Sequence, residues 1–197
     1  MRPQDWECGG VLPLSSVSSS LRDLLSRIEK CLKCYRKYRD YSDEDRLRIR
    51  EWCHEGVWFF PPCGKVKGFF GTGPIMFVCQ RPSTRGGKIP STLDLRFYKL
   101  LEKYGLENAH LTDLVKCRGL AGKISEEKID NCFPYLEEEI EILKPKLIVA
   151  VGNYVRRELN KKVQGIAIER IPHYAARGLS TEKLEREIAK IAKKVRD

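Results

Sequence analysis

The sequence feature that most limits the fold is an alternation of short apolar runs with amphipathic stretches after residue 74. Apolar runs at 75–78, 109–115, 147–152 and 165–171 predict buried strands, and apolar residues between them recur at helical spacing. Strands that alternate with helices are typical of a parallel sheet covered by helices on both faces. The sequence therefore predicts an α/β fold, a three-layer α/β/α sandwich with a central four-stranded parallel sheet.

Helix signals complete the predicted organisation. We expect helices from Ser20 onward, over about 94–104, from the cap Ser125 to Pro145, over 153–160, and from Ser180 onward. Residues 43–73 are rich in aromatic residues, Gly and Pro, which predicts an irregular insertion. We expect one domain over 1–197, with a helical N-terminal segment at 18–42 and this insertion.

Polar side chains follow the predicted strands. The first strand continues directly into Gln80-Arg81-Pro82-Ser83. Open α/β sheets bind ligands at the carboxyl ends of their strands, so this loop is a candidate site. Further candidates at the other strand ends are Asp113, Asn153, His173, Tyr174 and Arg177.

The charge balance favours a polyanionic partner. The net charge is +10, which suits nucleic acid, although a generic basic surface is the alternative. The Lys and Arg residues over 183–194 are interpreted as a solvated helix face. No run approaches the ~20 apolar residues of a membrane span, and the first residues lack a signal-peptide core. We expect an intracellular protein without membrane contact, and few Asn and Gln beside many Lys and Glu suggest a thermophilic source.

Eight cysteines in an intracellular chain indicate metal or cluster binding. Cys31 and Cys34 form a CxxC pair, and Cys117 and Cys132 form a later pair. Four such thiolates suit tetrahedral zinc or a four-iron cluster.

Two alternatives remain open for the cysteines. A local zinc site would instead combine the CxxC pair with Cys53, Cys63 and possibly His54. Cysteines can also simply fill core positions, which is our interpretation of Cys8 and Cys79.

Four blocks of the sequence follow the pattern of one known family. They are IMFVCQRPS, HLTDLVKCRG, CFPYLEEEIEILKPKLIVAVGN and IPHYAARG. Together they resemble the uracil-DNA glycosylase superfamily, and within it the iron–sulfur group called family 4. The similarity covers about residues 20–40 and 74–197. It implies that Cys31, Cys34, Cys117 and Cys132 bind a structural [4Fe–4S] cluster, with zinc as the alternative.

Three residues depart from the family pattern. Gln80 has a counterpart in the main uracil glycosylases, but Arg81 stands where they have an Asp that orients or activates water. A guanidinium cannot act as a general base. The family's loop histidine aligns with Ile171, and a histidine follows two places later, at His173. Asp113 stands where the family has an Asn.

The resemblance and the chemistry of the side chains suggest roles. Gln80 would read a base edge, His173 would donate to the departing base or hold a phosphate, and Asp113 would orient water. Tyr174 would wedge or stack, Arg81 and Arg177 would bind phosphates, and Pro82, Ser83 and Asn153 complete the DNA- and base-binding set. Each residue has a structural alternative, as a turn, loop or surface residue.

Two functional hypotheses follow. The first is a monofunctional DNA glycosylase that flips uracil or another deaminated base out of DNA and hydrolyses its N-glycosidic bond, leaving an abasic site. The rival is a catalytically inactive iron–sulfur protein of the same fold that binds nucleic acid. A zinc module using Cys53 and Cys63 is a third reading. We expect a monomer that acts on double- or single-stranded DNA.

Overall fold

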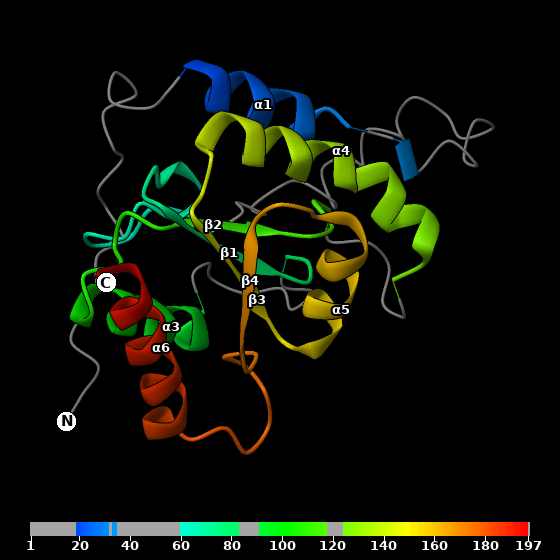
Figure 1. Ribbon diagram of the computed structural model, residues 1–197. Coiled ribbons are helices and arrows are strands. Elements are labelled where there is room, and N and C mark those ends of the chain that lie inside the picture. Colours follow the sequence, from blue (N-terminus) through cyan, green and yellow to red (C-terminus); the bar gives the residue numbers. More distant parts are fainter. Residues whose placement is uncertain (1–18, 32, 35–59, 83–90, 118–123, 197) are drawn as a thin grey trace.

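The computed structural model of the protein describes residues 19–31, 33–34, 60–82, 91–117 and 124–196 (Figure 1). At its centre lies a four-stranded, all-parallel sheet in the order β2-β1-β3-β4. The strands are β1 (Ile75–Cys79), β2 (His110–Asp113), β3 (Leu147–Val151) and β4 (Ala167–Ile171). The predicted fold class is therefore confirmed.

Helices cover both faces of the sheet in the described ranges. They are α1 (Ser19–Glu29), α3 (Thr92–Lys103), α4 (Glu126–Leu143), α5 (Asn153–Lys162) and α6 (Thr181–Arg196), with a short 3-10 turn η3 (Gly68–Phe70). Figure 1 shows α3 and α6 on one side of the sheet, and α1 with α4 on the other. Among the described residues, no helix is long and apolar enough to cross a membrane.

The central strand β1 contributes to two separate cores. Successive side chains of a strand point to opposite faces. Ile75 and Phe77 pack with residues of α3 and α6, whereas Met76 and Val78 pack with α4 and α5. The apolar face of α1 packs on the outer side of α4, against Tyr135. The sequence alternation thus produces the layers directly.

Helix caps explain the observed boundaries. The Ser125 hydroxyl accepts the N–H of Lys128 at the start of α4, as predicted. The predicted start of α3 was a little late, because Ser91 and Asp94 form a reciprocal capping box that begins this helix at Thr92. This box also matters for the site described below.

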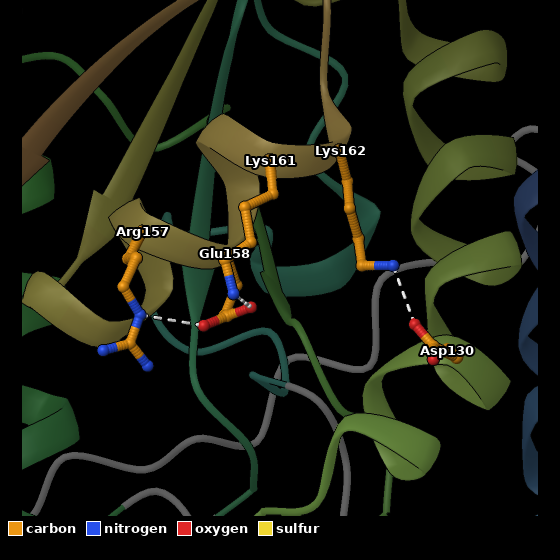
Figure 2. Close-up of polar contacts among 5 residues, drawn as sticks. All are labelled: Asp130, Arg157, Glu158, Lys161 and Lys162. Atoms are coloured by element: carbon orange, nitrogen blue, oxygen red, sulfur yellow. Dashed lines mark hydrogen bonds and ion pairs between the residues drawn. The ribbon is translucent and has the colours of Figure 1, made fainter.

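Polar contacts join α5 to α4 (Figure 2). Lys162 Nζ lies 2.7 Å from Asp130 Oδ1. On α5 itself, the buried Glu158 carboxylate accepts from Arg157 Nε and from Lys161 Nζ, each at 3.0 Å. Three cations of this basic helix are therefore paired with carboxylates of the protein.

Candidate active site

The backbone at the carboxyl ends of the strands is fixed by continued pairing. Cys79 lies opposite Asp113 at the ends of β1 and β2. Beyond these ends, the N–H of Leu114 donates to the Cys79 carbonyl at 2.8 Å, and the N–H of Gly152 donates to the Ile171 carbonyl at 2.9 Å. The loops that carry the candidate residues therefore begin at defined positions along one edge.

The predicted site residues follow these strand ends with different exposures. Gln80, Arg81 and His173 are half-buried, Asn153 and Arg177 are exposed, and Pro82, Asp113 and Tyr174 are buried. Ser83 lies outside the described residues. The structure brings Asp113 and Tyr174 into one electrostatic neighbourhood with Cys79, whereas Asn153 and Arg177 face solvent.

His173 is held in one tautomer by its own loop. Its Nδ1 accepts the backbone N–H of Ala175 at 3.1 Å, and its carbonyl accepts the N–H of Ala176 at 2.8 Å. Burial lowers the pKa of the ring, and the negative charge of Asp94 opposes this effect. At neutral pH the imidazole is therefore neutral and carries its proton on Nε2. The β3 end packs closely here: a β-carbon on Gly152, whose φ is +103°, would lie 3.7 Å from Cβ of His173.

Tyr174 is buried among protein side chains. Its ring stacks on Phe97 with a centroid distance of 4.8 Å and an interplanar angle of 8°. Its hydroxyl donates to Asp94 Oδ1 at 2.6 Å, and its carbonyl accepts from Arg96. In this structure the ring stacks within the protein, and its wedging or stacking with DNA stays a prediction.

Asp113 is a buried carboxyl with an unused oxygen. It is 2% exposed, and its Oδ1 finds no hydrogen-bond partner among the described residues. Burial raises the pKa of Asp113 to about 8; Lys116 opposes this, and the charges of Asp94 and Glu139 add to it. At neutral pH the carboxyl keeps its proton. It then presents one donor and one acceptor, as an amide would.

Sequence reasoning missed a buried polar network between β2 and α4. Lys116 Nζ lies 2.7 Å from Thr112 Oγ1 and from Glu139 Oε1, and Glu139 Oε2 lies 3.4 Å from Nε2 of His110. Burial alone would raise the pKa of Glu139, but Lys116 and His110 lower it. A signal was present: Glu139 follows the buried Leu136 by three residues, so a charged side chain had to fall on the inner face of the helix.

The four cysteines of the predicted cluster line one cavity. This cavity is enclosed by Cys31, Cys34, Cys117 and Cys132 with Ile28, Lys116 and Tyr135. All four cysteines are free of disulfide bonds. The end of α1, the β2–α4 connection and the first turns of α4 thus contribute thiols to the same place.

Hydrogen-bond donors surround these sulfur atoms. Asn131 Nδ2 lies 3.7 Å from Cys34 Sγ, and the N–H of Lys116 lies 3.5 Å from Cys132 Sγ. Hydrogen bonds with Cys117 and Cys132 lower the pKa of Cys34 below the usual value of a thiol. The described residues hold no group of three or more ligand side chains arranged for a single metal ion. Four thiols in one cavity, with N–H groups near the sulfurs, form a donor set that fits an iron–sulfur cluster.

Of the alternative zinc set, Cys63 lies in the described residues, where it is buried and packs in a core cluster with Phe60 and Val66. Cys53 and His54 lie outside the described residues, as does Cys8. Cys79 is buried at the end of β1, in agreement with its interpretation as a core residue.

Fold and site together define an open, parallel α/β protein with its polar candidate residues along the carboxyl edge of the sheet and a four-cysteine cavity on one flank. Residues 70–196 match the family model described as "Uracil DNA glycosylase superfamily". The chain belongs to this superfamily.

Two curated relatives are similar to part of the chain, and both are named type-4 uracil-DNA glycosylase. The one from Sulfurisphaera tokodaii is 32% identical over 97 residues, which cover 45% of this chain and 44% of the relative. The one from Saccharolobus solfataricus is 35% identical over 65 residues, or 30% of each chain. The chain thus spans less than half the length of each of these relatives.

Proposed function

We propose that this protein is a DNA glycosylase that removes uracil or another deaminated base and leaves an abasic site. Membership in the superfamily and the two type-4 relatives support glycosylase chemistry in general. The observation that carries the proposal is His173: a neutral imidazole at the carboxyl edge, with Nδ1 committed to its own loop and its proton on Nε2.

The proposed reaction breaks the bond between the base nitrogen and the sugar carbon. Both bonding electrons leave with the base, the oxygen of a water molecule forms the new bond to the sugar, and the proton lost by that water finally neutralises the released base. The departing base becomes anionic, and a hydrogen bond from His173 Nε2–H stabilises that charge. Gln80 supplies an amide donor and acceptor for the edge of the flipped base.

Asp113 can take one of two roles in this reaction, and the pH dependence of the activity distinguishes them. As a protonated acid it would read the base with one donor and one acceptor. As a carboxylate it would orient the water and accept its proton. Because its pKa is about 8, activity that declines through pH 8 indicates the first role, and activity that increases there indicates the second.

Basic side chains would hold the DNA backbone. Arg81 and Arg177 follow β1 and β4, and the net charge of the chain is +10. Phosphate contacts of this kind make binding weaker at high salt. We propose that the protein acts as a monomer on DNA inside the cell.

The four-cysteine cavity would hold the cofactor. Cys31, Cys34, Cys117 and Cys132 would bind a [4Fe–4S] cluster, with zinc as the alternative. When bound, the cluster would supply a cross-link between α1, the β2–α4 connection and α4. Iron and sulfide analysis of anaerobically purified protein distinguishes the two cofactors.

A catalytically inactive DNA-binding protein is the second candidate. The specific observation that favours it is Arg81, which stands where the main uracil glycosylases have a water-orienting acid. This candidate keeps the fold, the cluster and the basic residues, and loses only the chemistry.

The test is base release by anaerobically purified protein from labelled oligonucleotides. The panel contains uracil, hypoxanthine, xanthine and thymine, opposite each partner base and in single strands. We expect abasic sites from at least one substrate, and a large loss of rate in Gln80→Ala and His173→Ala. The matched control is Gln164→Ala, because Gln164 is exposed and precedes β4 at the opposite edge of the sheet. Salt-sensitive DNA binding without any cleavage would establish the second candidate.

A further inference from the structure

We propose that Asp94 and Tyr174 are positioning residues for His173, and that together they dock the loop after β4 onto the start of α3. The geometric link stands on contacts within the protein. Its consequence for base release rests on the proposed function.

Asp94 is itself fixed by the first turn of α3. Its Oδ2 accepts the Ser91 backbone N–H at 2.8 Å and the Ser91 hydroxyl at 2.7 Å. These bonds complete the capping box, and a carboxylate at a helix N-terminus is also favoured by the helix dipole. Oδ1 is thereby aimed at the Tyr174 hydroxyl, which donates to it at 2.6 Å.

Tyr174 attaches the loop after β4 to α3 through three contacts. The hydroxyl binds Asp94, the carbonyl accepts from Arg96, and the ring stacks on Phe97. Phe97 in turn meets Phe77 of β1 edge-on, with centroids 5.6 Å apart. The loop is therefore attached to the sheet core through buried aromatic rings.

The ring of His173 also packs on the Tyr174 ring. The two rings stack with centroids 4.9 Å apart and an angle of 26°. The ring plane is therefore set by Tyr174, and the tautomer is set by the Ala175 N–H that donates to Nδ1. If the tyrosine moves, the imidazole loses its stacking partner, and the backbone turn that presents the Ala175 N–H is released from α3.

Asp94 also acts on His173 through its charge. Its negative charge favours the protonated ring, in opposition to the burial that lowers the pKa of His173. Positioning and electrostatics can therefore be separated by substitution. Asp94→Asn removes the charge and keeps one oxygen, which can accept the Tyr174 hydroxyl while the amide nitrogen faces Ser91 and donates to its hydroxyl oxygen. Tyr174→Phe keeps the charge and the ring but removes the hydroxyl.

The experiment is nitrogen-15 NMR of the histidine rings in the full-length protein with its cofactor, with His173→Ala used for assignment. In the wild type we expect one neutral tautomer, with Nδ1 unprotonated. Asp94→Asn should lower the pKa of His173, whereas the control Asp130→Asn, an exposed carboxylate on α4, should leave it unchanged. Tyr174→Phe should give a mixture of tautomers.

Kinetics test the consequence for the reaction. In Tyr174→Phe we expect kcat to fall roughly tenfold or more, because small misplacements of a reacting group have large effects, while KM changes less than about twofold. The proposal is overturned if Tyr174→Phe keeps the wild-type tautomer and kcat, or if Asp94→Asn leaves the pKa of His173 where it was. If the wild type releases no base, the proposed function fails, but the NMR result still decides whether Asp94 and Tyr174 position His173.

Discussion

The buried Asp113 makes the stability of the folded protein depend on pH. Its pKa is raised from the ordinary value of 3.8 to about 8 by burial. Between these two values the folded state holds a proton that the unfolded state releases, so the free energy of unfolding falls as pH rises through this window. At about 1.4 kcal/mol per pH unit, the full effect is about 5–6 kcal/mol. This loss of stability is absent below about pH 4 and complete above about pH 8.

Asp113→Asn tests this reasoning. The amide has the same shape, supplies one donor and one acceptor, and cannot ionise. Compared with the wild type, the variant should be more stable at pH 9, with the difference shrinking steadily as the pH falls to 5. Urea unfolding midpoints and slopes at each pH, measured at equal cluster content, give the difference in the free energy of unfolding.

The control for this experiment is again Asp130→Asn. The Asp130 carboxylate is exposed and paired with Lys162, so its loss should change stability by no more than about 1 kcal/mol. Parallel stability curves for the wild type and Asp113→Asn across pH 5–9 would refute the reasoning. They would mean that Asp113 is ionised in the folded protein, and that it could not act as a neutral reader of the base at pH 7.

Three further predictions concern the buried network, the cofactor and DNA. Glu139→Gln should destabilise the protein by about 3–5 kcal/mol, because it leaves the Lys116 ammonium buried without its carboxylate. Urea unfolding measures this loss, and a double variant with Lys116→Met should recover part of it. Cys34→Ser should lower the iron content and visible absorbance of the purified protein, whereas an unchanged iron content would exclude Cys34 as a ligand. Arg177→Ala should weaken DNA binding about equally for all sequences and reduce the slope of log affinity against log salt by about 1. Lys193→Ala, on the exposed face of α6, is the control. Equal salt slopes for Arg177→Ala and the wild type would show that Arg177 does not contact DNA.

Periodicity was sufficient to predict the sheet and its helices. The run at 147–152 is short and apolar throughout and ends at a glycine, which predicts a strand buried on both faces, and it forms the inner strand β3. The prediction of a helix over about 94–104 does not single out Phe97, which carries the aromatic contacts of the loop after β4. The spacing of apolar residues locates an element well, but it does not single out the residue that joins two elements.

The properties of individual site residues were harder to predict. An aromatic residue in a polar loop has the same local pattern whether it faces DNA or the core, so the expectation that Tyr174 would wedge or stack did not include its burial against α3. The raised pKa of Asp113 depends first on burial and then on the charges of Asp94 and Glu139, which are distant in sequence. The cysteines were different, because the CxxC pair and the two later cysteines together resembled a known family pattern, and the four predicted residues line one cavity.

The carboxyl edge carries a particular balance of charge, with Arg81 and no acid directly after Gln80. At neutral pH the buried Asp113 is protonated and His173 is neutral, while Arg81 remains positive. The remaining carboxylate, Asp94, is held by the capping box and the Tyr174 hydroxyl. These candidate groups therefore place little free negative charge at the edge. An edge of this kind is suited to stabilise negative charge on a departing base and on phosphates, and less suited to stabilise positive charge on the sugar. Under the proposed function, catalysis at this edge would depend on the leaving base more than on activation of water.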